Sequence, residues 1–398
     1  MAIYLANPEA FGPHRVETLQ GIAAGQFPEP FLPDVTVYVV PEAADFVALG
    51  DFDRDGRVDL LTAKRGGTSL HLLSNNGTDG FEAAQTIALP GDVTALVAGR
   101  FDPSDETQDL AIAVSGPAGP RVLVYASARS IADVEPLAYP VPSEATVLVA
   151  AELDDRPFMD LAVLAGSDVF IVHGAGEQPR NDGSETAFAR SRVERVHAAG
   201  NVLSLAVGDF VPDRESRNEF AMLSDQGDVA FVSRGTLDVR PMTEDEIVAG
   251  RQRFAEARDR SENHVGDTAP WKQSDSDSWS EVRRVTVSSA LLDRVPTRPV
   301  LMGANVAAQP GEELLVLDPT SDQLQIVSVG SDWQKGESGE ALRTVTLTAG
   351  GAPVAALPMR LGVLAQPGLI VLSEGHAGVR AILPKVAATF TVTKTADT

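Results

Sequence analysis

Short hydrophobic runs, separated by Gly, Asn, Asp and Pro, recur along almost the whole chain and fall into groups of four. The first two runs of a group are almost entirely apolar, as at 109–113, whereas the last two mix in polar residues, as at 193–196. A strand buried on both faces is apolar throughout, while a strand with a solvent-facing side alternates between apolar and polar residues. The pattern therefore predicts an all-β chain of four-stranded units with buried inner strands and exposed outer strands.

These units form an internal repeat, and six copies are recognisable. The first runs begin at Phe46, Thr94, Thr146, Leu203, Pro299 and Pro353, and the second runs at Asp59, Asp109, Asp160, Glu219, Glu313 and Gly368. The third runs lie at 70–73, 122–125, 169–172, 229–232, 324–327 and 379–383, and the fourth at 85–89, 137–141, 193–196, 285–288, 344–347 and 389–392. A period of about fifty residues with four strands per unit is typical of the blades of a β-propeller.

The number of blades depends on the two ends of the chain. Residues 1–45 contain one clear strand-like run, 35–40, and two weaker ones, 3–5 and 16–22. A propeller ring closes when one blade takes strands from both ends. We therefore expect a propeller over 46–394 with a seventh, divergent blade in which the run 35–40 lies near the last run, 389–392. Six blades with an N-terminal extension are the alternative, and 395–398 would begin a linker or a following segment.

The loop between the first two strands of the first unit has the spacing of a metal site. Asp51, Asp53, Asp55 and Asp59 occupy positions 1, 3, 5 and 9, with Gly56 at position 6. Carboxylates on alternate residues of a tight loop converge on one point, and the carbonyl of Arg57 at position 7 faces the same point. Because strands flank the loop and no Glu stands at position 12, it is not an EF-hand. We predict a Ca²⁺ ion held by the four aspartates and the carbonyl of Arg57.

The corresponding loops of the other units are weaker candidates for Ca²⁺. They are Glu152, Asp154 and Asp160 in the third unit, and Asp209, Asp213 and Glu219 in the fourth. In the third unit Arg156 replaces the third carboxylate, and it would neutralise the loop by a salt bridge. The loop of the second unit begins with a cation, Arg100. The fifth and sixth units lack the pattern, and we expect packing and backbone hydrogen bonds alone to hold their turns.

The chain resembles a known repeat family. The stretch Gly50-Asp-Phe-Asp-Arg-Asp-Gly-Arg-Val-Asp-Leu60, followed by Leu72-Leu-Ser-Asn-Asn-Gly-Thr-Asp-Gly-Phe81, is similar to the FG-GAP and VCBS repeats of integrin-type β-propellers. The similarity covers nearly the whole chain but fades along it. It implies a calcium-stabilised disc, most often of seven blades. Residues 388–398 resemble the opening of the CSLREA segment of large bacterial surface proteins, so we interpret the chain as a piece of a longer surface protein.

An insertion separates the third and fourth strands of the fourth unit, over 235–281. Thr243 and Glu246 form a capping box that predicts a helix through Ser261. Two tryptophans, Trp271 and Trp279, follow in a polar stretch. Strand alternation places the insertion on the face that carries the Asp51 loop. It is either a contact surface for a partner or an elaborated loop that packs on its own blade.

Composition removes several classes of function. The formal net charge is −24, with 56 acidic and 32 basic residues among 398. Such a surface repels phosphate backbones and anionic lipids, so we expect neither nucleic-acid binding nor membrane insertion. The absence of cysteine excludes disulfides. No apolar run is long enough for a membrane-spanning helix, and no signal peptide is visible after Met1.

Two classes of function remain. The six histidines are scattered, and no nucleophile, nucleotide-binding or zinc-protease motif is present. We therefore expect a non-catalytic, calcium-stabilised binding, adhesion or structural module of a secreted or cell-surface protein, with a protein or glycan ligand. The alternative is a polysaccharide-cleaving enzyme, because some lyases resemble this propeller. Three Trp and four Tyr residues, without a sugar-stacking pattern, make that alternative weaker.

Overall fold

A computed structural model shows an all-β chain built from small antiparallel sheets. The structure describes residues 2–24, 26, 28–29, 31–77, 80–101, 107–126, 130–154, 159–174, 193–198, 200–211, 217–235, 243, 245–246, 248, 279–287, 299–307, 311–329, 342–359, 368–376 and 378–383.

The six predicted units form six sheets, which we call blades one to six. Blade one contains β3 (Phe46–Gly50), β4 (Asp59–Ala63), β5 (Ser69–Leu73) and β6 (Gln85–Ala88). Blade two contains β7 (Asp92–Gly99), β8 (Asp109–Ser115), β9 (Arg121–Tyr125) and β10 (Leu137–Pro140). Blade three contains β11 (Ala145–Ala151), β12 (Asp160–Ala165), β13 (Asp168–Val172) and β14 (Val193–His197).

The remaining blades follow the same order along the chain. Blade four contains β15 (Val202–Gly208), β16 (Glu219–Ser224), β17 (Asp228–Arg234) and β18 (Trp279–Thr286). Blade five contains β19 (Val300–Ala304), β20 (Glu313–Leu317), β21 (Gln323–Val329) and β22 (Leu342–Thr348). Blade six has three strands among the described residues, β23 (Pro353–Met359), β24 (Gly368–Ser373) and β25 (Arg380–Ile382).

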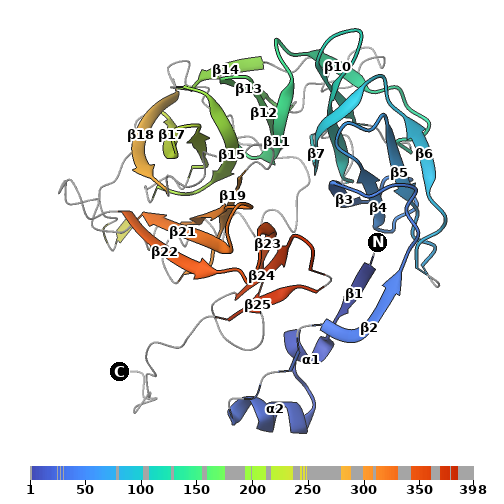
Figure 1. Cartoon of the computed structure of the whole chain (residues 1–398), viewed down its shortest axis with the longest axis vertical. Helices are drawn as coiled ribbons and strands as arrows, with labels where there is room; N and C mark the ends of the chain where they lie inside the picture. Colours follow the sequence, from blue (N-terminus) through green and yellow to red (C-terminus); the bar gives the residue numbers. More distant parts are fainter. Residues whose placement is uncertain are drawn as a thin grey trace.

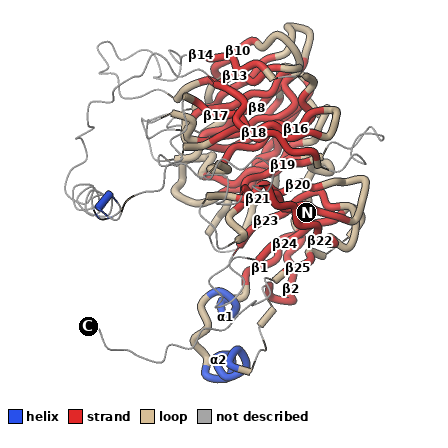
Figure 2. The backbone as a smooth tube through the Cα atoms, turned by 90° about the vertical axis from the view of Figure 1, so that its left-hand side faces the viewer, coloured by secondary structure: helices blue, strands red, loops and turns tan. Residues whose placement is uncertain are grey.

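The blades stand around a ring as a β-propeller, which confirms the predicted fold class (Figure 1). The first strand of each blade lies innermost, and the first strands of successive blades contact one another. The side view in Figure 2 shows the blades stacked against each other. The second strands are buried along most of their length, as in β4 and β12, whereas outer strands such as β6 are mostly exposed. This is the burial gradient that the sequence predicts.

Among the described residues, the hydrophobic core forms five clusters, and each joins two neighbouring blades. Leu61 of blade one and Ile112 of blade two, for example, share one cluster. A single four-stranded sheet has two faces to bury, so each blade depends on its neighbours for stability.

The N-terminal segment differs from the prediction. It contains β1 (Ala2–Ala6), α1 (Pro8–Phe11), α2 (Val16–Ala23) and β2 (Phe31–Val37). The run 16–22, which we expected as a weak strand, is helical: Val16, Leu19 and Ile22 recur at helical spacing, and this spacing prevailed over the β-branched residues.

The described part of the chain holds six blades and not the seventh four-stranded blade that we expected. Among the described strands, β1 pairs with β2 alone, as a two-stranded antiparallel sheet at the edge of the ring between blades one and six (Figures 1 and 2). Too few strands come from residues 1–45 to form a blade, because α1 and α2 take up much of that segment. The run 389–392 lies outside the described residues, so its closure with 35–40 stays a prediction.

The insertion in blade four is described only in part. Within the capping box, the backbone N–H of Thr243 donates to Glu246 Oε2 at 2.8 Å, and the Glu246 N–H reaches Thr243 Oγ1 at 3.4 Å. The predicted helix beyond Val248 and Trp271 lie outside the described residues. Trp279, which we placed in the insertion, is the first residue of β18, and its ring packs 4.7 Å from that of Phe220. It therefore belongs to the core of the propeller.

A Gly-x-Phe motif ends the first strand of three blades and joins them to their neighbours. In blade two the ring of Phe101 is fully buried and folds back over Gly99. A Cβ atom at Gly99 would lie 2.8 Å from that ring and 2.7 Å from the Cβ of Ala150 in blade three. The glycine is therefore required by the close approach of two blades.

We predict that Gly99→Ala destabilises the propeller by about 1–3 kcal/mol, because the added methyl group overpacks the interface between blades two and three. Urea denaturation gives the free energy of unfolding. Gly378→Ala is the matched control, since a Cβ at Gly378 meets no atom within 4 Å. Equal stability of the two variants would contradict the assigned contact.

Candidate metal centre

The loop between β3 and β4 folds around its own aspartates. Gly56 has φ +85° and Arg54 has φ +66°, so two residues adopt the left-handed conformation that a sharp turn needs. The carboxylate of Asp51 accepts hydrogen bonds from the backbone N–H groups of Asp55 and Gly56, both at 3.0 Å. The loop therefore holds Asp51 in place before any ligand binds.

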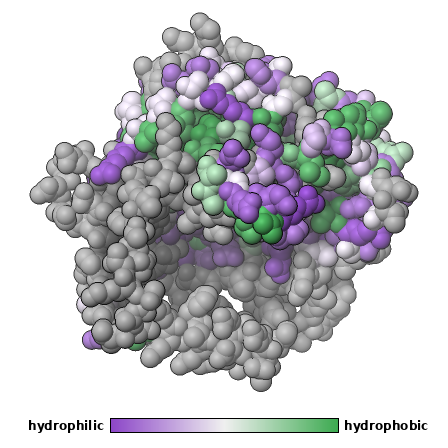
Figure 3. All heavy atoms as spheres, turned by 90° about the horizontal axis from the view of Figure 1, so that it is seen from below, coloured by the Kyte–Doolittle hydropathy of each residue, from purple (hydrophilic) through white to green (hydrophobic). Residues whose placement is uncertain are grey.

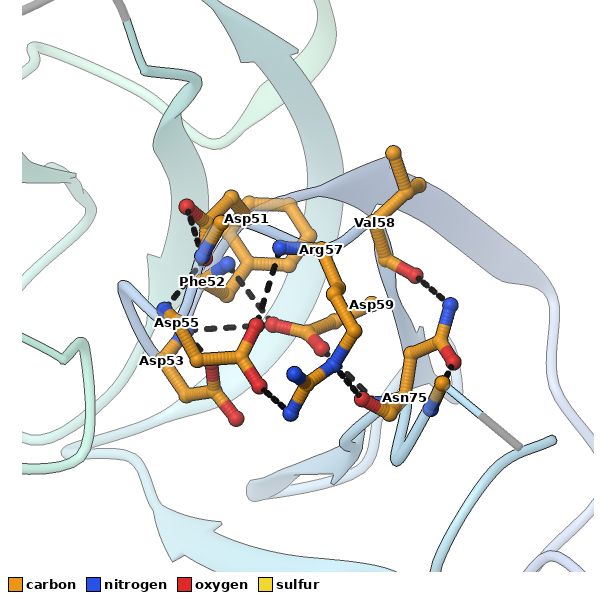
Figure 4. A network of polar contacts seen from close by, with 10 residues as sticks. Asp51, Phe52, Asp53, Asp55, Arg57, Val58, Asp59 and Asn75 are labelled. Carbon is orange, nitrogen blue, oxygen red and sulfur yellow. Dashed lines mark hydrogen bonds and ion pairs between the residues drawn. The ribbon is translucent and has the colours of Figure 1, made fainter. Parts of the chain in front are cut away.

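Asp59, the first residue of β4, ties the loop to the blade. Its Oδ2 accepts from the backbone N–H groups of Phe52 at 2.8 Å and Asp53 at 3.1 Å, and its Oδ1 accepts from that of Asn75 at 3.0 Å (Figure 4). The side chain is fully buried. Burial raises the pKa of Asp59, and these hydrogen bonds to the ionised form only partly oppose the rise.

Three of the four predicted carboxylates come together. Oxygen atoms of Asp51, Asp53 and Asp59 all lie within 4.8 Å of one another. The carboxylate of Asp55 instead pairs with the guanidinium group of Arg57, which also donates to the Asn75 carbonyl at 2.5 Å (Figure 4). The side chain of Arg57 thus competes for Asp55, a contact that the loop spacing does not reveal. The three grouped carboxylates form an oxygen-rich cluster suited to a hard cation.

The acidic residue that begins the second strand, like Asp59 in blade one, also binds the preceding loop in other blades. Asp109, Asp160, Glu219 and Glu313 each accept a hydrogen bond from a backbone N–H of the preceding loop, at 2.8–3.0 Å. Of these, we expected Asp160 and Glu219 as metal ligands and assigned no role to Glu313. The expectation that backbone bonds and packing alone hold the turn of the fifth unit is therefore wrong, because the Glu313 carboxylate bonds Val306 and Ala307.

The second and fourth loops show no grouped carboxylates among the described residues. In blade two the carboxylate of Asp109, the first residue of β8, lies 3.6 Å from the guanidinium group of Arg54, a residue of the blade-one loop. In blade four the carboxylate of Glu219 is engaged by the backbone of Phe210 and Val211 and by the hydroxyl of Ser233. Asp209 accepts from Glu312 through its backbone carbonyl, and Asp213 lies outside the described residues.

Blade three contains a second cluster, which includes a histidine that sequence reasoning missed. His173 follows β13, and its Nδ1 lies 3.3 Å from Asp154 Oδ2 and 3.3 Å from Asp160 Oδ1. Glu152 is exposed and does not belong to this cluster, and Arg156 lies outside the described residues. The signal for His173 was its place in the repeat: it stands directly after the third strand, where Ser74 stands in blade one.

The pKa of His173 is raised far above its ordinary value. Burial of the ring disfavours the imidazolium form, but the adjacent carboxylates of Asp154 and Asp160 more than offset burial and raise the pKa of His173 to about 9. In the absence of a metal, the imidazolium of His173 therefore balances the negative charge of Asp154 and Asp160. We had expected Arg156 to neutralise this loop.

No family model and no curated protein matches this sequence. Solved structures show the same fold. The crystal structure of BBS1N in complex with ARL6DN, soaked with lead, superimposes with a TM-score of 0.50 at 10% identity, over 89% of this chain and 82% of that chain. The Chaetomium thermophilum heterotrimeric Nup82 NTD–Nup159 TAIL–Nup145N APD complex gives a TM-score of 0.50 at 11% identity, over 96% of this chain and 91% of that chain.

The fold and these likenesses define the class: the chain is a β-propeller. Within the described residues, no helix has the length and apolar character that a membrane span requires.

We predict that His173 makes stability depend on pH when metals are removed by chelator. Its folded pKa of about 9 lies above the ordinary value of 6.5, so the stabilisation is complete below pH 6.5 and is lost as the pH rises through 9. The difference in unfolding free energy between the native chain and His173→Asn should shrink over this window, by up to about 3 kcal/mol. Urea denaturation at both ends of the window measures it, and parallel pH profiles would contradict it.

Proposed function

We propose that this chain is a calcium-stabilised, non-catalytic binding module of a secreted or cell-surface protein, in which the propeller presents its surface to a protein or glycan ligand. The observation that carries the calcium part is the grouping of Asp51, Asp53 and Asp59 within 4.8 Å in a loop whose backbone already fixes them.

The charges in this loop favour a divalent cation. The carboxylates of Asp51, Asp53 and Asp59 repel one another. The guanidinium group of Arg57 is paired with Asp55 and does not offset this repulsion. Ca²⁺ accepts carboxylate and carbonyl oxygens in flexible geometry, and this loop offers both kinds. The carbonyl of Arg57 and the carboxylate of Asp55 would complete the coordination after a small rearrangement. Extracellular modules commonly bind Ca²⁺ at about 10⁻⁴–10⁻³ M, which fits a surface location.

The fold supports a binding role. Two of the solved structures that this chain resembles were determined in complexes with other proteins. A ring of blades buries its core between the blades and leaves its loops and outer strands for contacts. Figure 3 shows one face on which hydrophilic and hydrophobic residues are interspersed. With a net charge of −24, basic partners would associate faster than acidic ones.

We predict that Asp53→Ala lowers the melting temperature in millimolar calcium but has little effect in EDTA, because the variant loses ligand-linked stability and not packing. Differential scanning calorimetry in both conditions measures this. Asp133→Ala is the charge-matched control, since Asp133 is an exposed aspartate outside the metal loops. An equal loss in both conditions would show that Asp53 stabilises the loop without metal.

We also predict one calcium site per chain. Among the described residues, only the loops of blades one and three bring acidic side chains together as a possible metal site, and the group in blade three includes a histidine. Isothermal titration with Ca²⁺ should give a stoichiometry of one, abolished by Asp53→Ala. Several equivalent sites would overturn the assignment.

The binding role is tested on the whole chain with a glycan array and a panel of basic and acidic proteins, in calcium and in EDTA. We expect a ligand that is retained in calcium, released in EDTA and recovered unchanged. Cleavage of a polysaccharide from the array would contradict the non-catalytic role and would support the alternative, a polysaccharide-cleaving enzyme.

A further inference from the structure

We propose that blade three holds a second metal site, for a divalent cation of the Zn²⁺ class, with Asp154, Asp160 and His173 as ligands. It differs from the calcium site of blade one in position, in donor atoms and in the metal it would select. It lies where the loop between β11 and β12 meets the end of β13.

The distances match a small tetrahedral ion. His173 Nδ1 lies 3.3 Å from an oxygen of Asp154 and 3.3 Å from an oxygen of Asp160. Zn–N and Zn–O bonds of about 2.0–2.1 Å place neighbouring ligand atoms of a tetrahedral site about 3.3 Å apart. All three donor atoms lie within 4.8 Å of one another, so one ion reaches them together, with water as a fourth ligand.

The histidine nitrogen points into this cluster without a hydrogen bond. The side chain of His173 is 7% exposed, and its Nδ1 makes no hydrogen bond to any described residue. The two nearby carboxylate oxygens are close enough for an ion pair, yet neither has hydrogen-bond geometry. A buried ring nitrogen between two carboxylates, without a directed hydrogen bond, is an arrangement that a metal ion satisfies.

The surroundings fix two of the three ligands, His173 and Asp160, as in known metal sites. The other ring nitrogen of His173, Nε2, lies 3.3 Å from Glu194 Oε2. A histidine that binds a metal usually donates its second N–H to a carboxylate in this way, which sets the tautomer and the ring orientation. Asp160 is held by the backbone N–H groups of Leu153 at 3.0 Å and Gly174 at 2.8 Å.

The donor set selects the metal. Ca²⁺ and Mg²⁺ prefer oxygen ligands, whereas imidazole suits Zn²⁺ and its neighbours among the transition metals. The side chains of Asp154 and Asp160 are 10% and 1% exposed, so the site is also drier than the calcium loop. Blade one has no histidine in its cluster and would keep its preference for Ca²⁺.

The proposal is tested by titrating the whole chain with Zn²⁺, and with Co²⁺ as a spectroscopic probe, while saturating Ca²⁺ fills the loop of blade one. We expect one equivalent of Zn²⁺ per chain and the intense visible absorption of tetrahedral Co²⁺. His173→Asn should abolish both signals. Glu194→Gln removes only the orienting carboxylate, so we expect about 10–100-fold weaker binding.

Two controls separate this site from other histidines and from the calcium loop. His71→Asn replaces a histidine that is equally buried and also lies 3.3 Å from a glutamate, Glu42, but belongs to no cluster of metal-binding side chains among the described residues. We expect His71→Asn and Asp53→Ala to bind Zn²⁺ with the same affinity as the native chain. Failure of the native chain to bind, or unchanged binding by His173→Asn, would overturn the proposal. If His173→Asn does not fold, as judged by circular dichroism, unchanged affinity of Glu194→Gln would overturn it instead.

Discussion

The propeller depends on one interaction that recurs from blade to blade: a buried carboxylate at the start of the second strand accepts backbone N–H groups of the loop before it. Asp59, Asp109, Asp160, Glu219 and Glu313 make this bond in five successive blades. The loop cannot use strand pairing to satisfy these donors, and an unpaired buried N–H costs about 1–3 kcal/mol. The carboxylate therefore determines the shape of the loop. In blades one, two and four the loop in turn positions the Phe of the Gly-x-Phe motif at the contact with the next blade.

A buried carboxylate also needs compensation for its charge, and the blades provide it differently. In blade two the guanidinium group of Arg54 crosses from the neighbouring blade to Asp109. In blade three the imidazole of His173 lies between Asp154 and Asp160. In blade one further aspartates gather around Asp59, which favours a cation from solution. One structural device thus gives rise both to ion pairs within the protein and to candidate metal sites.

The strands of the blades were predictable because each blade must bury two faces. Every repeat therefore needs the same pattern of apolar residues in its strands. The N-terminal segment lacks that constraint, so the run from Val16 was read as a strand although it forms α2. Asp51, Asp53 and Asp59 followed from loop spacing, but the pairing of Asp55 with Arg57 depends on side-chain competition. His173 was missed because its partners Asp154 and Asp160 are brought to it only by strand pairing.

We infer that carboxylates in equivalent loops are balanced by different cations. Anomalous diffraction from crystals grown with Ca²⁺ and Zn²⁺, recorded on both sides of the zinc absorption edge, identifies the ion in each loop. We expect a peak that is insensitive to the zinc edge among Asp51, Asp53 and Asp59, and a zinc-specific peak beside His173 Nδ1. Ordered density for neither ion, or the same ion in both loops, would contradict it.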